Sequence, residues 1–408
     1  MRTASKIVII SAFFLSLFSA AFAATWSDIA ATADNNDELI SAGKQLEGAR
    51  WSYNRAWSTF LPQVSLNASY SENLNGGTSE TTGSYSWGIR ATEYLFQGMQ
   101  EYYGLSSSWA NYEMTFASYK KTESDVYYEL RSAFIGLYIA KQNIVLSNKI
   151  LDQLNENARL IKLRYNSGRE DKGNMLSTQA SAKGGEADVS AAERDFGLAK
   201  LKLFQLTSLE VDNVEGPLDV TFEASPDFGS LNDNSPALLT ARYQLEITDI
   251  AAQNTVSEFL PTVSLSGNYS KAGNTWPPES ENKSWSLNLS YSLFPGGANF
   301  ADKMINDLNL EKARKDYEIT RKNGLFNIED AYRQLKNAVD ALEVARVFLD
   351  AAAERSRIAD AKYLNGLITY DEWSRITNDY ISSQKSALSA QRTALTALAA
   401  FKNSYGGK

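Results

Sequence analysis

The chain has 408 residues, a formal net charge of −8 at pH 7, and neither histidine nor cysteine. The lack of both residue types excludes Ser-His-Asp triads, imidazole metal sites, thiol nucleophiles and zinc-thiolate centres. The acidic balance argues against nucleic acid as a partner, because phosphate groups require clustered cations.

The residue types that remain leave little room for an enzyme. The sequence has no phosphate-binding loop of the Gly-x4-Gly-Lys-Ser/Thr kind. Hydrolysis by two carboxylates stays open in principle, but no pair of acids can be placed together in a cleft. We therefore expect no catalytic residue, no metal site and no cofactor.

Residues 1–23 are predicted to be a secretory signal peptide. Arg2 and Lys6 precede an apolar run over 7–18, and a small-x-small cleavage sequence follows at 21–23. The run is too short to anchor the chain in a membrane. Removing the two cations takes the formal net charge from −8 to −10.

Two segments that follow alternate apolar with small polar residues. At about 61–71, Val64, Leu66 and Tyr70 share one face and serine and asparagine share the other, and about 84–95 alternates likewise. This period of two predicts two strands that pair as a hairpin. The turn between them is polar and glycine-rich around 75–78.

A long helical hairpin is predicted over about 98–208. No proline lies between Pro62 and Pro217, and apolar residues recur at steps of four and three, as in a coiled-coil seam. Only Ser147 interrupts this seam, and Gly168 marks the turn between the two arms. The outgoing arm would be on the order of 100 Å long. The seam residues are Val126, Leu130, Ala133, Leu137, Ala140, Ile144, Leu151, Leu154, Ala158, Ile161 and Tyr165.

The second half repeats the first at an almost constant offset of about 199 residues, as from Phe60 to Phe259. The blocks Phe-Leu-Pro-x-Val-Ser-Leu and Leu-Phe-x-Gly both return, and the turn at Gly168 returns at Gly366. Alternation predicts strands at about 260–270 and 284–293, and a second proline-free stretch predicts a helical hairpin at about 298–402. A unit this long is a duplicated half-molecule, with repeats at 24–230 and 231–408.

The strands and helices each allow two interpretations. The helices fit a plain stalk or, because Phe134, Tyr138 and Val145 lie off the seam, a bundle or helical barrel. The strands fit a soluble half-buried sheet or a membrane barrel; a polar face whose one charge is Arg90, opposite an aromatic face, favours the barrel. Four strands cannot close a barrel, so two copies would give eight strands and three would give twelve.

These blocks, in this order and spacing, resemble the TolC-type outer membrane efflux channel family over essentially the whole mature chain. The resemblance implies a mainly α protein with a small β part. It implies a homotrimer that shares a 12-stranded β-barrel, with coiled-coil hairpins forming an α-helical barrel and an equatorial segment at 209–230. It also implies the outer membrane of a bacterial cell as location, with a large periplasmic part.

The resemblance further implies a passive exit duct of a tripartite efflux or type I secretion system. Its partners would be a periplasmic adaptor (membrane fusion) protein, an inner-membrane transporter and outer membrane lipid. The alternative is a periplasmic coiled-coil scaffold without a channel.

In that family the hairpin tips form the periplasmic gate and the adaptor-docking site. Carried over by position, Gly168, Gly366, Leu367 and Thr369 are the docking residues, and Tyr363 is the aromatic residue before the second turn.

The gate positions depart from the family pattern. Asn174 and Glu372 stand where an Asp is frequent, and Ile368 stands where an Arg is frequent. We therefore expect no ionic lock between the tips and at most a hydrogen bond from Tyr363 to Asn174.

Asp371 and Glu372 are the remaining gate residues. Threefold repetition would place their carboxylates near one axis, where they would line the entrance and favour cations. The alternative is an ordinary pair of solvated acids at the start of a helix, where the macrodipole favours them.

Overall fold

The computed structural model describes residues 23–73, 82–216, 220–223 and 226–408. Almost all of the predicted signal peptide, the turn at 75–78 and parts of the segment 209–230 therefore lie outside the described residues. The chain is mainly helical with a small β part. No helix in the described part of the chain is both long and apolar enough to cross a membrane.

The chain divides into two compact units. We call Met1–Thr32, Leu130–Asp219 and Leu342–Leu395 the tip unit, because it contains both hairpin turns. We call Ala33–Glu129, Val220–Ala341 and Thr396–Lys408 the sheet unit. Three long helices, α3 (Gln100–Asn166), α7 (Ala298–Leu364) and α8 (Tyr370–Ser404), contribute residues to both.

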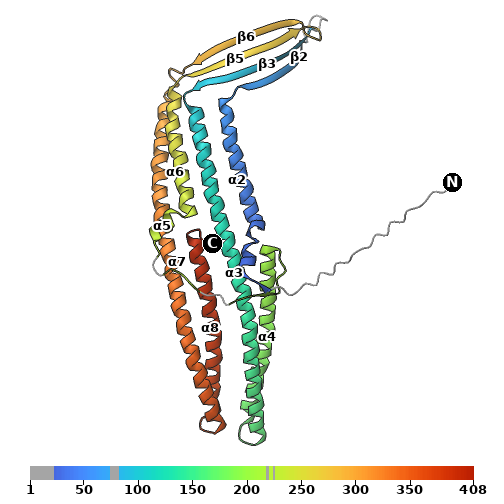
Figure 1. The fold of residues 1–408 in the computed structure, drawn as a ribbon, viewed down its shortest axis with the longest axis vertical. Coiled ribbons are helices and arrows are strands. Elements are labelled where there is room, and N and C mark those ends of the chain that lie inside the picture. Colours follow the sequence, from blue (N-terminus) through green and yellow to red (C-terminus); the bar gives the residue numbers. More distant parts are fainter. Residues whose placement is uncertain (1–22, 74–81, 217–219, 224–225) are drawn as a thin grey trace, which may run out of the picture. The chain divides into compact units, whose positions relative to one another are not determined.

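The sheet unit contains a four-stranded antiparallel sheet in the order β2-β3-β5-β6 (Figure 1). Its strands are β2 (Gln63–Asn73), β3 (Thr82–Gln97), β5 (Thr262–Gly273) and β6 (Ser280–Ser290). Strand β3 is longer at both ends than the expected 84–95. The two expected hairpins, β2–β3 and β5–β6, are joined to each other by pairing of β3 with β5.

The strand register gives the sheet one apolar and one polar face. Leu66 lies opposite Ile89, and Leu265 lies opposite Leu287. On the other face, two pairs of serine hydroxyls bond across neighbouring strands, Ser69–Ser86 at 2.7 Å and Ser266–Ser286 at 2.8 Å. Arg90 shares this polar face, between Ser65 and Asn268.

The sheet has two open edges, β2 and β6. All described residues of both strands are exposed to solvent in the single chain. The apolar face is exposed as well, with Leu66 at 71% and Leu289 at 70%. The sheet therefore offers a neighbour both unpaired backbone groups and apolar surface.

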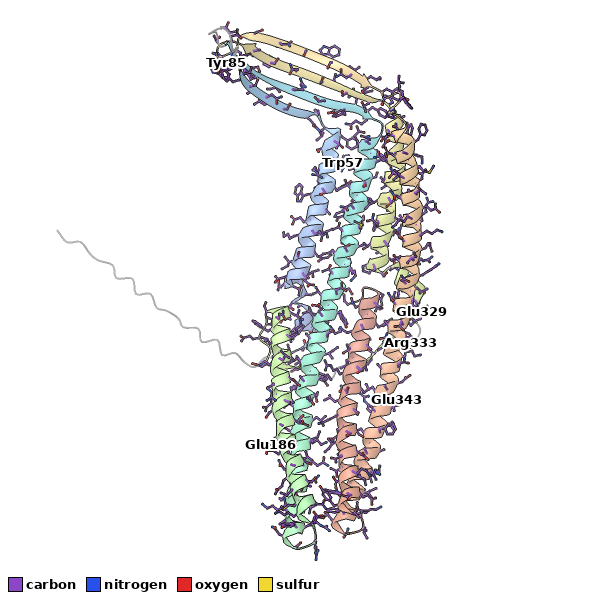
Figure 2. The ribbon with its side chains drawn as sticks, turned by 180° about the vertical axis from the view of Figure 1, so that it is seen from behind. Trp57, Tyr85, Glu186, Glu329, Arg333 and Glu343 are labelled. Carbon is purple, nitrogen blue, oxygen red and sulfur yellow. The ribbon has the colours of Figure 1, made fainter. Side chains whose placement is uncertain are left out.

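The helices of the sheet unit begin at strong capping residues. Asn36 caps α2 (Asp37–Ala56), Asp227 caps α5 (Phe228–Asp233), and Ser235 followed by Pro236 starts α6 (Pro236–Asn254). Short 3-10 segments, η2 (Trp57–Phe60) and η3 (Thr255–Phe259), lead into β2 and β5. Figure 2 labels Trp57 in η2 and Tyr85 in β3. The core of this unit contains Ile328, Tyr332, Leu335, Leu398 and Phe401.

The tip unit holds two helical hairpins. The first pairs the later part of α3 (Gln100–Asn166) with α4 (Lys172–Thr207), and the second pairs the end of α7 (Ala298–Leu364) with α8 (Tyr370–Ser404). The unit also contains α1 (Trp26–Ala30). The two-residue strand β1 (Ala23–Ala24) precedes it and pairs in parallel with β4 (Asn213–Val214). Trp26 packs edge-on against Phe134 and lies under the Arg131 guanidinium.

The predicted seam of α3 is shielded from solvent, because each of its residues is buried or half-buried. Leu130, Leu137 and Ile161 are fully inaccessible, and Ser147, the expected interruption, is also buried, at 5% exposure. Of the off-seam residues, Phe134 is buried at 1%, whereas Val145 is exposed at 58%. The helix thus contacts more than one neighbour over part of its length only.

Candidate gate and docking site at the hairpin tips

Both hairpins turn through the same hydrogen-bonded ring. In the first, the N–H groups of Gly168 and Arg169 donate to the carbonyls of Tyr165 and Arg164, both at 2.9 Å. In the second, Gly366 and Leu367 donate to the carbonyls of Tyr363 and Lys362, at 3.0 and 2.9 Å. This pairing is a Schellman motif.

The glycine of each ring has a left-handed backbone conformation. The φ angles are +72° at Gly168 and +71° at Gly366, a region that side chains with a Cβ rarely adopt. At both glycines, the position that a Cβ atom would take has no neighbouring atom within 4 Å. Both glycines are therefore required by the backbone conformation and not by a close neighbour.

An apolar cluster lies directly behind the turns and joins the two hairpins. Its buried members come from α3, α7 and α8, and Met175 of α4 packs against them. Tyr363 and Trp373, each 2% exposed, stack with ring centroids 4.7 Å apart and an angle of 11°. The buried members are Ile161, Ala359, Tyr363, Trp373 and Ile376.

A polar network crosses from one hairpin to the other at this cluster. The Tyr363 hydroxyl donates a short hydrogen bond to Glu170, which lies in the turn of the first hairpin. The Asn174 amide donates to the other oxygen of the same carboxylate at 2.8 Å. Arg164 donates to the Tyr363 carbonyl at 3.0 Å, and its guanidinium lies 4.5 Å from the Tyr363 ring centroid. We call Arg164, Glu170, Asn174 and Tyr363 the tip latch.

The tip latch holds Tyr363 as a neutral donor. Burial, followed by the hydrogen bond to Glu170, raises the pKa of the Tyr363 phenol well above its ordinary value. The phenol therefore keeps its proton at all physiological pH values. A neutral phenol beside a carboxylate forms a charge-assisted hydrogen bond, which is stronger than a neutral one.

Trp373 is held by a second polar contact. Its indole N–H donates to Asp360 at 2.7 Å, one turn of α7 before Tyr363. The indole thus satisfies its only donor while its ring covers Tyr363. The pair keeps the end of α7 and the start of α8 in a fixed relation.

Comparison with known sequences places this arrangement in a family. The sequence profile described as outer membrane efflux protein matches residues 29–208 and 229–407. The chain belongs to the outer membrane efflux protein family. This efflux protein is an outer membrane exit duct for efflux or type I secretion, and the predicted fold class, function and location are confirmed.

Relatives of the efflux protein are distant in sequence and close in fold. The outer membrane efflux protein BepC of Brucella suis biovar 1 is 20% identical over 365 residues, covering 86% of this chain and 78% of BepC. The outer membrane protein TolC of Vibrio cholerae is 22% identical over 344 residues, covering 81% and 76%. The open state of the MtrE channel of Neisseria gonorrhoeae superposes with a TM-score of 0.82 at 17% identity, covering 94% and 89%.

The predicted gate residues of the efflux protein are brought together differently from what we expected. Tyr363 donates to Glu170 and not to Asn174, which instead bonds the same carboxylate from the other side. The reason is geometric: Glu170 belongs to the turn itself and reaches back, whereas Asn174 lies in the first turn of α4. Ile368, at the position of the family's frequent Arg, packs against the apolar cluster.

Asp371 and Glu372 lie in the first turn of α8 and are exposed. Neither carboxylate makes a hydrogen bond or an ion pair with the described residues of the single chain. The Glu372 backbone N–H donates to the Thr369 hydroxyl at 3.3 Å, so Thr369 caps α8. Leu367, between the turn glycine and this cap, is 71% exposed.

Sequence reasoning missed three members of the site, Arg164, Glu170 and Trp373. A signal for Arg164 lies in the repeat, because Lys362 is the cation at the same distance before Gly366. A signal for Trp373 lies in its spacing from Ile376 and Tyr380, which fits one face of a helix. Glu170 gave no signal beyond the charge of the first tip, because a turn residue belongs to no helical period.

Proposed function

We propose that three copies of this efflux protein form one closed duct, as the resemblance implies. The support comes from the sheet, whose edges β2 and β6 are both unpaired in the single chain. Open edges are not tolerated in lipid, because their backbone groups would lack partners. Three copies would supply twelve strands with no edge left, the polar serine face lining the duct and the leucine face meeting lipid.

The tips are proposed to be the periplasmic gate, and the observation that carries this proposal is the Tyr363–Glu170 hydrogen bond. This bond joins the second hairpin to the turn of the first within one chain. The two hairpins can separate only if the bond breaks, together with the contacts of the apolar cluster. The network therefore stabilises one relative position of the hairpins, which we assign to the closed state.

The exposed turns are proposed to dock the periplasmic adaptor. Gly168, Gly366, Leu367 and Thr369 lie at the ends of the hairpins, and Leu367 offers an apolar side chain to a partner. The energy for transport would come from an inner-membrane transporter, because the duct is passive. We infer no catalytic step in this chain.

The proposed entrance carries negative charge. Asp371 and Glu372 are exposed and unpaired among the described residues, so in a trimer their carboxylates would be free to act on passing ions. A ring of carboxylates at a constriction attracts cations and repels anions.

Single-channel recording in planar lipid bilayers tests the gate. Tyr363→Phe removes the donor and keeps the ring, and a hydrogen bond to a charged group contributes about 1.5–3 kcal/mol. We expect the closed-to-open equilibrium to shift toward the open state by roughly tenfold or more. Tyr370→Phe is the matched control, because Tyr370 packs in the same cluster but its hydroxyl bonds no described residue. Equal open probabilities in the two variants would contradict the proposal.

A further inference from the structure

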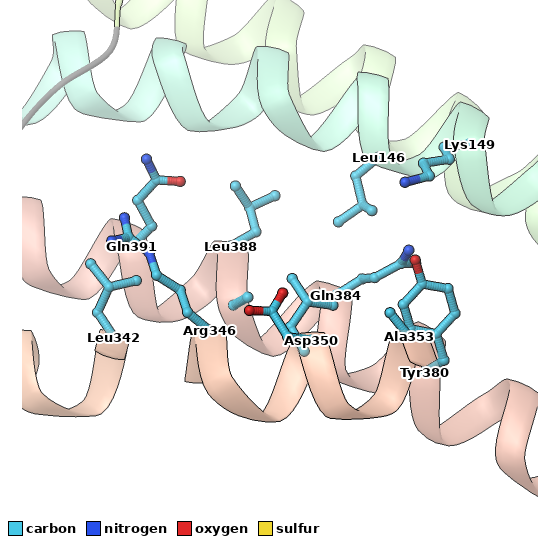
Figure 3. Close-up of a pocket in the computed structure, with 12 residues that line it drawn as sticks. Leu146, Lys149, Leu342, Arg346, Asp350, Ala353, Tyr380, Gln384, Leu388 and Gln391 are labelled. Atoms are coloured by element: carbon cyan, nitrogen blue, oxygen red, sulfur yellow. The ribbon is translucent and has the colours of Figure 1, made fainter. Parts of the chain in front are cut away.

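A groove between the two hairpins of the tip unit is lined by polar side chains that lack partners. It has a volume of about 440 Å³ and lies between α3, α7 and α8 (Figure 3). It lies away from the tip latch and shares no residue with it. A test of a binding site in this groove is therefore independent of any test of the proposed gate.

Gln384 of α8 is the buried polar residue of the groove. It is 6% exposed, and its Oε1 atom has no hydrogen-bond partner among the described residues. In Figure 3 its side chain extends from α8 into the space between the helices. A buried carbonyl oxygen without a donor is costly, and nearly all such atoms in folded proteins find one. The groove thus presents an unsatisfied acceptor.

Charged side chains surround this acceptor. Lys149 comes from α3, and Arg346 and Asp350 come from α7. None of the three forms a hydrogen bond or ion pair within the described chain, although Arg346 and Asp350 are four residues apart on one helix. At the same spacing on the same helix, Lys312 and Asp316 do pair, at 2.5 Å. The groove therefore carries two cations and one carboxylate, a net charge of +1, available to a ligand.

The remaining wall of the groove is aliphatic. It is formed mainly by Leu146, Leu342, Leu349 and Leu388. Leu342 is buried and the other three are half-buried. A ligand that fits must therefore combine an aliphatic body with a donor for Gln384 and an anionic group for Lys149 and Arg346.

We propose that this groove is a binding site for small amphipathic amide-carboxylates of the N-acyl amino acid type. The acyl chain lies on the leucine wall, the amide N–H donates to Oε1 of Gln384, and the carboxylate pairs with Lys149 and Arg346. Asp350 excludes ligands with a second anionic group, because two like charges would meet there. Because α3 belongs to one hairpin and α7 and α8 to the other, the bound ligand contacts both.

Isothermal titration calorimetry of the full mature protein in lipid nanodiscs tests the site, with N-octanoylglycine as the probe. N-octanoylsarcosine is the matched ligand, because its amide nitrogen is methylated and cannot donate. After subtraction of the heat from empty nanodiscs, we expect saturable binding of the glycine compound and about fivefold weaker binding of the sarcosine compound, the effect of one hydrogen bond. Equal affinities, or heats no larger than those of empty nanodiscs, overturn the proposal.

Two variants separate the roles of the groove residues. Gln384→Leu should abolish the preference for the glycine compound, whereas Gln179→Leu, an exposed glutamine on α4 outside the groove, should keep it. The double variant Lys149→Gln, Arg346→Gln should weaken both compounds by about tenfold or more. A preference that survives in Gln384→Leu, or affinities unchanged in the double variant, would refute the assignment. The comparison of the two ligands on the unaltered protein decides the matter even if a variant fails to fold.

Discussion

The two hairpin tips share one backbone and differ in side-chain chemistry. Each turns through the same pair of backbone hydrogen bonds and a left-handed glycine, at Gly168 and at Gly366. The first tip continues with four charged residues over 169–172, and the second with Leu367, Ile368 and Thr369. The duplication thus preserved the turn and allowed the exposed residues to diverge.

Because of this difference, the two tips contribute different chemical groups to the site. The first tip supplies the acceptor of the tip latch, Glu170, and otherwise faces solvent. The second supplies the donor, Tyr363, the stacked Trp373 and an exposed leucine. Apolar surface that is exposed at a loop tip is suited to a partner, whereas charged surface is suited to water. We therefore expect docking to depend more on the second tip.

The largest effect is expected from valine at the two turn glycines. Both positions have nearly the same positive φ, so Gly168→Val and Gly366→Val should incur similar backbone strain, on the order of 1–3 kcal/mol. Gly366→Val should abolish pump assembly and export, and Gly168→Val should reduce them less. Export by each strain, normalised to the amount of protein in the outer membrane, measures the difference. Full export by the Gly366→Val strain would contradict the assignment of the second tip to the docking site.

The next effect concerns the apolar cluster, to which the second hairpin contributes more than the first. Trp373→Ala removes a buried, stacked ring and should destabilise the tip by about 3–5 kcal/mol. Met175→Ala, on the first hairpin and only partly buried, should cost less. Limited proteolysis at the tips and thermal unfolding measure the loss of stability in both variants. Trp51→Ala, at a tryptophan that is 66% exposed, serves as the control and should change little. Similar losses for Met175→Ala and Trp373→Ala would contradict this asymmetry.

A smaller effect is expected from the acids that follow the second turn. The double variant Asp371→Asn, Glu372→Gln removes two charges per chain and should lower the cation-to-anion permeability ratio severalfold. Reversal potentials in a salt gradient measure it. The corresponding change on the first tip, Asp171→Asn, alters a helix cap and should leave the ratio nearly constant. If ion selectivity stays the same in the double variant, the acids are simply helix-starting residues.

The smallest effect is expected from Asn174. Its amide orients the Glu170 carboxylate but does not itself cross between the hairpins. Asn174→Ala should weaken the latch by about 1 kcal/mol or less, well below Tyr363→Phe. The open probabilities of Asn174→Ala and Tyr363→Phe, recorded under the same conditions, show which variant has the larger effect. An equal or larger effect of Asn174→Ala would mean that Tyr363 depends on Asn174 after all.

The fold could be predicted from the sequence because its signals are periodic and repeated. The alternation around Leu66 and the three-four spacing around Leu137 each indicate one type of secondary structure, and the second half supplies an independent copy. The left-handed glycines could also be predicted, since few residues other than glycine adopt such turns. The sequence indicated that Phe134 could belong to the core although it lies off the seam. It could not indicate which other off-seam residues are buried, because such a residue is buried only where a second element covers it.

The tip latch could be predicted only in part. Tyr363 was identified, but its partner was not, since Glu170 lies in a turn whose side-chain directions no period determines. The partner could have been suspected from charge alone, because a buried phenol favours an ionised acceptor. The expected hydrogen bond from Tyr363 to Asn174 is replaced by one to Glu170, because this chain has its carboxylate four residues before the family position at Asn174.

The two open strand edges have a consequence for the order of events in the cell. In a single chain, β2 and β6 each lack an outer partner, so the backbone groups that face outward along an eleven-residue strand are unsatisfied at each edge of the sheet. Such a chain cannot enter a bilayer by itself, because each free edge group would lose water without gaining a partner. In the proposed trimer, insertion would therefore be coupled to association, and its rate should rise more steeply than linearly with the supply of newly exported chains. An excess of a damaged chain that still associates would therefore keep the intact chains bound to it from inserting into the membrane.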